Sequence, residues 1–410
     1  MVSLAPEAAL IALLLLPAAL ANGQTSHLWI SERAFELLPE GELRDALARE
    51  DVHVALRNGT MFPDGGYPLG DDYAEIAHWE PFQGLYLDWI RDHYSPPWSD
   101  EALVHIGFLM GLGSHGLADQ TYDALYMERA KQEDAASDWA TYSMDEATDV
   151  ALATQEGAQE VSEDVVPYDL LVELYADYGY TVERATLEEG QSLLRLAVGL
   201  VGQMGENGTA IALYEERFPW ATTHQFDPDQ PGTPEDEAHI VAAYWAVIWG
   251  RLHGEDWREE PLLGTFPLDG AYAQPRDASR VESRVALVYS RGVEEASLSV
   301  GDLQVTDGAG QAHPFDIDLF YGQSAHIVLV KPTEDWAEDQ TYAVTAAPTV
   351  TFLDGTTLQE EVGFGFSTGE APPEVEADPT EPGCGCAASR TSPAWAGLLA
   401  GLALLRRRRS

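Results

Sequence analysis

The sequence predicts a multi-domain protein in which an all-α domain is followed by a small all-β sandwich and a C-terminal tail. Over roughly the first 260 residues, apolar side chains recur at helical spacing. From about residue 266 the pattern changes to short apolar or alternating segments separated by turns. Because the chain has 410 residues, it is long enough for two cores and a tail.

The chain is strongly acidic. It has 69 Asp and Glu against 22 Lys and Arg, a formal net charge of −47, and its only lysines are Lys131 and Lys331. Nucleic-acid binding needs clustered basic groups that displace counterions, so we expect no nucleic-acid partner. A solvated surface suited to high salt accounts for the acidity, and attraction of a cationic head group is the alternative.

The N-terminal residues 1–21 have the pattern of a signal peptide. An apolar run at residues 11–16 precedes Ala19-Leu20-Ala21, a small-x-small cleavage site. The protein is therefore expected to be exported, to the cell surface or outer membrane or into the medium. Both cysteines, Cys384 and Cys386, lie in the tail, so the two domains need no disulfide bonds.

The first part of the predicted helical domain alternates helices and turns. Residues 28–38 present one apolar face and predict a helix, and residues 57–73 are rich in turn formers around Asp64. Residues 73–94 are helical in pattern and end before Pro96-Pro97. Ser99 then follows as the N-cap of the next helix.

The stretch from residue 101 to 131 is the centre of the predicted domain. Its first half is apolar enough for a buried helix, and its second half places His115, Asp119 and Asp123 at four-residue intervals, within a stripe about 80° wide. Burying an imidazole and two carboxylates together is costly unless a cation lies against them, and a divalent metal is the natural candidate. Solvated acids beside a packed histidine are the alternative.

Further helices are predicted at residues 166–180, 187–204 and 235–252, and His239 in the last is expected to be packed rather than to bind a metal. The acidic run after Lys131 repeats the four-residue spacing at Asp145 and Asp149, although an acidic surface helix would produce the same pattern.

The β domain is predicted at residues 266–370, a sandwich of roughly 100 residues that resembles Ig-like modules in outline. Its strands are expected at residues 283–288, 296–300, 325–330, 342–346 and 362–367. Nothing in it suggests catalysis, so we interpret it as a spacer or stabilising module. An acidic, Pro-rich linker at 371–383 leads to a tail at 384–410, whose apolar run is shorter than the roughly 20 residues of a stable membrane span.

Four ordered motifs resemble the zinc-dependent phospholipase C family, which includes the catalytic domain of GPI-specific phospholipase D. They are Ser-His-Leu-Trp-Ile at 26–30, Phe-Pro-Asp at 62–64, His-Trp-Glu-Pro-Phe at 78–82 and Ser-His-Gly-Leu-Ala-Asp at 114–119. The resemblance implies a helical fold of the phospholipase C and P1 nuclease type over residues 22–263. The tail resembles a MYXO-CTERM sorting signal, which implies a bacterial surface protein handled by sorting machinery.

The resemblance also implies a zinc centre of two or three ions. Asp64, His78, His115 and Asp119 would enclose one zinc, and His27 would hold a second with Asp119 as a bridge and, as a further candidate, the Asn22 amine. At the third position the chain departs from the family. There Asp123 would replace a histidine, and Asp145 and Asp149 would replace a pair made of a histidine and an acidic residue. Because three carboxylates make a harder site, this position suits Mg²⁺, Mn²⁺ or Ca²⁺ better than zinc, or it is empty.

The function that follows is a metal-dependent phosphodiesterase of the phospholipase C type, with a phospholipid or other phosphodiester as substrate at a membrane surface. Asp64 is the predicted catalytic residue, orienting the attacking water as ligand, base or both. Tyr67, Tyr73 or Tyr122 could contact a choline-like head group, although packing also explains them. The alternatives are a single-strand nuclease with three metals and a metal-stabilised surface adhesin without turnover.

Overall fold

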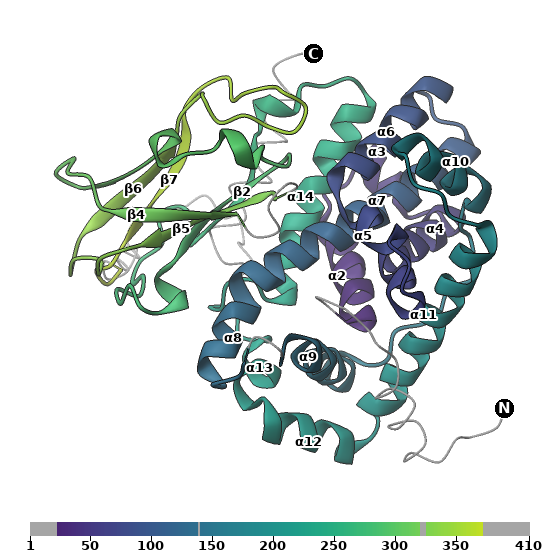
Figure 1. Cartoon of the computed structure of the whole chain (residues 1–410), viewed down its shortest axis with the longest axis horizontal. Coiled ribbons are helices and arrows are strands. Elements are labelled where there is room, and N and C mark those ends of the chain that lie inside the picture. Colours follow the sequence, from purple (N-terminus) through teal and green to yellow (C-terminus); the bar gives the residue numbers. More distant parts are fainter. Residues whose placement is uncertain (1–22, 138–139, 320–324, 372–410) are drawn as a thin grey trace, which may run out of the picture.

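The computed structural model describes residues 23–137, 140–319 and 325–371. Within these residues the predicted order of a helical part followed by an antiparallel β part is confirmed (Figure 1). The predicted signal peptide, the Asn22 amine, nearly all of the linker and the tail with both cysteines lie outside the described residues. In the described part of the chain, no helix is long and apolar enough to cross a membrane.

The helical part surrounds one long helix, α7. Its elements are α2 (Gln24–Leu37), α3 (Glu42–Leu47), α4 (Glu50–Met61), the 3₁₀ helix η1 (Phe62–Leu69), α5 (Tyr73–His78), α6 (Glu80–His93), α7 (Asp100–Thr121), the π-helical turn η2 (Tyr122–Met127), α8 (Glu128–Glu133), α9 (Thr141–Glu156), α10 (Tyr168–Tyr178), α11 (Arg184–Gly205), α12 (Gly208–Arg217), α13 (Pro219–His224) and α14 (Pro234–Leu252).

Helix α7 begins where the sequence predicts. The Ser99 side chain caps it by accepting a hydrogen bond from the Ala102 amide at 3.2 Å. From Ile106 onward every residue of α7 is buried. Helix α4 lies so close to α7 that a Cβ atom on Gly59 would be 2.1 Å from the Phe108 carbonyl oxygen, which explains why glycine occupies that position. α7 continues through the π-helical turn, a feature found often at functional sites.

Two local predictions were wrong. The turn-rich segment is largely helical, since α4 extends to Met61 and the 3₁₀ helix η1 follows directly, with Pro63 in its first turn, where a missing N–H costs nothing. The single helix expected at residues 73–94 is two helices, with Trp79 extended between them. Pro81 in the first turn of α6 cannot continue the hydrogen bonding of α5, so the helix breaks there.

The β part consists of two antiparallel sheets with strand orders β1-β2-β5-β4 and β3-β6-β7. The strands are β1 (Leu262–Phe266), β2 (Val285–Tyr289), β3 (Leu303–Asp307), β4 (Phe315–Leu319), β5 (Ile327–Pro332), β6 (Thr341–Ala346) and β7 (Val362–Ser367). Side chains from both sheets share one core, including Leu287 and Val330 from the first and Val305 and Phe364 from the second.

The strand predicted at residues 296–300 was wrong, because two short 3₁₀ turns occupy this region, Glu295–Ser297 and Val300–Asp302. Ser299 caps the second turn in a reciprocal arrangement with Asp302, so local side-chain hydrogen bonds replace strand pairing.

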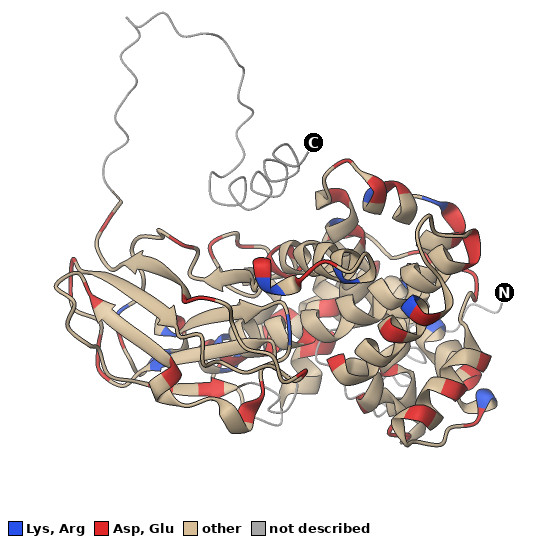
Figure 2. Ribbon diagram, turned by 90° about the horizontal axis from the view of Figure 1, so that it is seen from above, with Lys and Arg blue, Asp and Glu red and all other residues tan. Residues whose placement is uncertain are grey.

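The helical and β parts are joined by a continuous hydrophobic core. The core around α7 and α14 includes Phe266, Val288 and Ile327 of the sheet β1-β2-β5-β4. In Figure 1, α14 lies beside the β part, with most of the other helices on its far side. Acidic residues are spread over both parts, as Figure 2 shows.

Candidate metal centre

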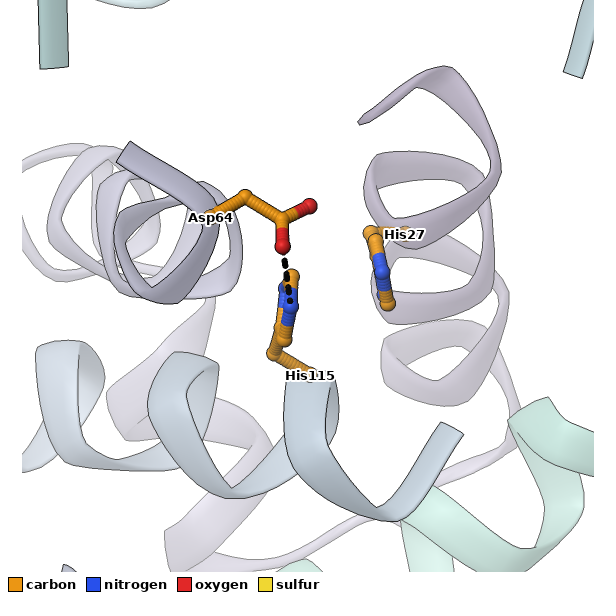
Figure 3. Close-up of side chains that lie close together, drawn as sticks. All are labelled: His27, Asp64 and His115. Carbon is orange, nitrogen blue, oxygen red and sulfur yellow. Dashed lines mark ion pairs between the residues drawn. The ribbon is translucent and has the colours of Figure 1, made fainter. Parts of the chain in front are cut away.

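Five of the residues predicted to bind metal lie together at the centre of the helical part. His27 comes from α2, Asp64 from η1, His78 from the end of α5, and His115 and Asp119 from consecutive turns of α7. Each is no more than 4% exposed. Figure 3 shows His27, Asp64 and His115 approaching one another from three separate elements. The structure therefore brings together residues that are up to 92 positions apart in the sequence (119 minus 27).

The Nε2 atoms of the histidines face the two carboxylates. His78 Nε2 lies 3.3 Å from Asp64 Oδ1 and 3.4 Å from Asp119 Oδ2, and His115 Nε2 lies 3.4 Å from each of the same oxygens. His27 Nε2 lies 3.1 Å from the other oxygen of Asp119, Oδ1. Asp119 thus contacts all three imidazoles, as expected for a bridging carboxylate. Imidazole nitrogen and carboxylate oxygen are the ligand types that zinc takes in hydrolytic sites.

Backbone carbonyls fix the orientation of two of the rings. His115 Nδ1 donates to the Thr60 carbonyl at 2.6 Å, and His78 Nδ1 donates to the Ala74 carbonyl at 2.7 Å. With Nδ1 held in this way, Nε2 of each ring is directed to the centre, which is the arrangement typical of metal-binding histidines. The His27 ring stacks on His115 with centroids 3.7 Å apart, which fixes the third ring.

Gln24 is a contact that the sequence analysis missed. Its side-chain amide donates to Asp64 Oδ2, which leaves Oδ1 facing His78 and His115. Gln24 precedes His27 by three residues on α2, so helical spacing alone would have placed both on one face. That spacing was the signal that could have identified it.

The cluster keeps its carboxylates ionised. Although burial would raise the pKa of Asp64, His115 and His78 hold it below its usual value. Burial opposes ionisation of Asp119 in the same way, and His27 and His115 lower its pKa strongly. Burial lowers the pKa of His78, but Asp119 and Asp64 outweigh it and raise that pKa to about 10. Buried anions that attract protons this strongly also attract divalent cations.

Asp123 and Asp145 form a second acidic pair beside this cluster. Asp123 lies in the π-helical turn and Asp145 on α9, and both are buried. Neither oxygen of the Asp145 carboxylate has a hydrogen-bond partner in the part of the chain that the structure describes. Burial and the charge of Asp123 raise the pKa of Asp145 well above its usual value. This pair therefore favours a proton or a hard cation.

Asp149 has a structural role that the sequence did not indicate. Its Oδ1 accepts hydrogen bonds from the Ser26 amide at 2.7 Å and the Ser26 hydroxyl at 2.9 Å, and its Oδ2 accepts from the Thr25 amide at 3.3 Å. The carboxylate thus accepts hydrogen bonds from backbone N–H groups in the first turn of α2, which have no acceptor within the helix; α2 is the helix that carries His27. These bonds account for its burial without a metal.

Of the three predicted head-group aromatics, only Tyr67 is accessible. Tyr73 and Tyr122 are fully buried in the helical core, so they offer no surface to a ligand. Tyr67 is half-buried, and its ring centroid lies 5.4 Å from that of His78, with Trp79 on the same histidine at 5.7 Å. His239 lies outside the cluster, as expected, with Nε2 3.7 Å from Glu235 Oε1.

Comparison with known proteins finds distant similarity to phosphatidylinositol-glycan-specific phospholipase D. The identity is 32% over 118 residues with the Bos taurus protein and 30% over 115 residues with the Homo sapiens protein, in each case 26% of this chain and 14% of the relative. With the Dictyostelium discoideum protein it is 27% over 252 residues, 57% of this chain and 26% of the relative. The chain thus spans about a quarter or less of the length of these relatives.

No protein-family model matches the chain. Among solved structures, domains 1–6 of the surface layer protein SbsC align with a TM-score of 0.22 and 8% identity, over 80% of this chain and 45% of that one. The N-terminal part of SbsC gives a TM-score of 0.21. Similarity at this level supports no argument about fold or function.

Proposed function

We propose that the protein is a zinc-dependent phosphodiester hydrolase that cleaves phospholipids in a phospholipase C-type reaction. The observation that carries the proposal is the convergence of three imidazoles and two ionised carboxylates in one buried cluster. Histidines are the ion-pair partners that the structure shows for Asp64 and Asp119. The similarity to a phospholipase supports a phospholipid as the substrate class.

The residues present fit zinc. His78, His115, Asp64 and Asp119 would hold one ion, and His27 with Asp119 a second, since each ring offers Nε2 to a carboxylate-lined centre. Bound zinc would supply positive charge to the phosphate oxygens and make a water more acidic. Asp123 and Asp145 would hold Mg²⁺, Mn²⁺ or Ca²⁺ in a third position or leave it empty, and Asp149 would contribute there only if its bonds to α2 were broken.

Asp64 is the proposed catalytic residue. Gln24 holds its Oδ2, so Oδ1 is the atom directed into the centre. Because its pKa lies below the usual value, Asp64 is ionised at neutral pH and is a weak base. Its role is therefore to accept a hydrogen bond from the attacking water and to orient that water toward phosphorus.

The setting of the reaction is also part of the proposal. We propose that the protein is exported, that it resides at the cell surface or is secreted, and that sorting machinery processes its tail. These proposals depend on residues outside the described structure. The membrane surface would present the substrate. A net charge of −47 repels polyanions, which disfavours the nuclease alternative. The Asp149 cap and the departures at the third position favour, as the second candidate, a metal-stabilised surface protein without turnover.

The test compares hydrolysis of phosphatidylcholine, phosphatidylinositol and single-stranded DNA by the zinc-loaded protein. We expect diacylglycerol from at least one lipid, little cleavage of DNA, and loss of both activity and bound zinc in His115→Ala. His239→Ala is the matched control, since it removes a histidine outside the cluster and should retain both. Phosphatidic acid as the product would indicate D-type cleavage, and full activity of His115→Ala would refute the site.

A further inference from the structure

The β part contacts the helical part at residues adjacent to two of the proposed metal ligands. Glu80 follows His78 by two residues, and Gln120 directly follows Asp119. Both side chains are buried, at 3% and 2% exposure, and both bind groups from the β part. The sequence predicts a β part that is only a spacer or stabilising module, whereas these contacts connect it to the segments that carry His78 and Asp119.

Glu80 binds groups from both parts of the chain. Its Oε2 accepts a hydrogen bond from the Gly292 amide at 2.6 Å, and its Oε1 lies 2.5 Å from Arg291 Nε, both in the β part. The same Oε1 accepts from Arg251 of α14 at 3.3 Å. A buried carboxylate with two guanidinium partners and a backbone amide has a strongly defined position.

Gln120 makes the second contact. Its Oε1 accepts a hydrogen bond from the backbone amide of His326 at 2.7 Å. His326 is itself held, because its Nδ1 is 2.9 Å from the Tyr289 carbonyl and its ring packs edge-on against Tyr244 of α14. Its Nε2 lies 3.8 Å from Glu80 Oε2, so the two contacts belong to one buried network.

We infer that Glu80 and Gln120 are positioning residues through which the β part holds the segments of His78 and Asp119 in the geometry of the metal centre. Each contact acts within two residues of a proposed ligand, on α7 for Asp119 and across the extended Trp79 for His78, in a close-packed interior that transmits small displacements. Groups that hydrogen-bond directly to metal ligands typically change metal affinity by about 10–100-fold, so for contacts one or two residues away we expect an effect at the lower end of this range. The inference rests on the proposed metal centre and adds that the β part is required for its geometry.

The experiment measures zinc affinity and the absorption spectrum of the Co²⁺-substituted full chain for Glu80→Gln and Gln120→Met. The first variant removes the charge of the carboxylate and keeps its shape. The second variant keeps a side chain of similar length and removes the amide group that accepts the hydrogen bond from the His326 amide. Both substitutions leave every proposed metal ligand in place.

Glu133→Gln is the matched control for loss of a contact between the two parts of the chain. Glu133 on α8 also pairs with an arginine of the β part, Arg280. It lies ten positions beyond Asp123, the nearest candidate ligand on the same helical segment (133 minus 123). Its substitution therefore weakens another ion pair between the two parts of the chain, a partly exposed one, at a distance from the proposed ligands.

We expect both variants to fold, as judged by circular dichroism, to bind zinc about tenfold more weakly and to shift the Co²⁺ bands. Glu133→Gln should match the wild type in both measurements. Wild-type zinc affinity and an unchanged Co²⁺ spectrum in both variants would overturn the inference while leaving the proposed function intact. A wild-type protein that binds no zinc would instead refute the metal centre itself. If Glu80→Gln fails to fold, Gln120→Met decides the question alone.

Discussion

Replacing Asp119 by Asn tests the centre most directly. Asp119 contacts His27 through one oxygen, at 3.1 Å, and His78 and His115 through the other, each at 3.4 Å. Asparagine has the same shape, but it carries no charge and one of its two terminal atoms is a donor. The variant therefore removes the charge of the proposed bridging ligand while leaving the packing of α7 nearly unchanged.

The expected loss follows from the number of ligands affected. Because outer contacts alone change metal affinity by about 10–100-fold, we expect loss of a bridging ligand to weaken zinc binding by more than about 100-fold. At a fixed, saturating free-zinc concentration, 100-fold weaker binding corresponds to about 2.7 kcal/mol less zinc-dependent stabilisation. The variant should thus lose about this much of the stability that zinc adds to the wild type.

The assay is urea unfolding at buffered free zinc and again in chelator, with the difference between the two giving the zinc-dependent part. Asp236→Asn is the control, because it makes the same substitution at an aspartate of α14 outside the cluster. The reasoning would be refuted if Asp119→Asn retained the wild-type increment, since the carboxylate would then not be a ligand.

Three further predictions concern stability. Asp149→Ala removes the acceptor for the Ser26 and Thr25 amides and should lower the free energy of unfolding by about 2 kcal/mol. The measurement is urea unfolding in chelator, and an unchanged free energy of unfolding would show that Asp149 does not cap α2. Gly116→Ala would place a Cβ atom 1.9 Å from the His78 carbonyl oxygen, so we expect the free energy of unfolding to fall by about 3 kcal/mol and zinc to bind more weakly. Unchanged stability and zinc affinity would contradict the close approach of α5 and α7. Burial raises the pKa of Asp236 to about 7, so the folded chain holds a proton there that the unfolded chain releases near pH 4. The contribution of this carboxyl group to stability should therefore fall as pH rises from 4 to 7. Asp236→Asn should lessen that fall by up to about 4 kcal/mol, and parallel pH profiles of the two proteins would refute the shift.

The sequence determined the content of the centre because the main signals are local. Helical geometry puts residues four apart on one face, so the spacing of His115 and Asp119 already implied a shared direction. The apolar length of α7 and the Ser99 cap likewise follow from neighbouring residues. The four motifs then supplied the partners of this helix from elsewhere in the chain.

Local patterns failed where packing decides the conformation. The segment before Asp64 has turn composition, but burial against α7 makes it helical. β1, β3 and β4 were not predicted. For β3 and β4 the reason is that partly exposed strands of five residues give a weak pattern until their partners are known.

Only the tertiary structure decided which acidic side chains lie in the proposed metal centre and which stabilise the surrounding fold. Asp149 has the spacing of a ligand but caps α2, and Glu80 lies in a ligand motif but binds the β part. One-dimensional spacing cannot distinguish these uses, because a carboxylate binds whichever cation or amide the fold places beside it. That placement depends on how α2, α9 and the β part pack, which no short stretch of the sequence encodes.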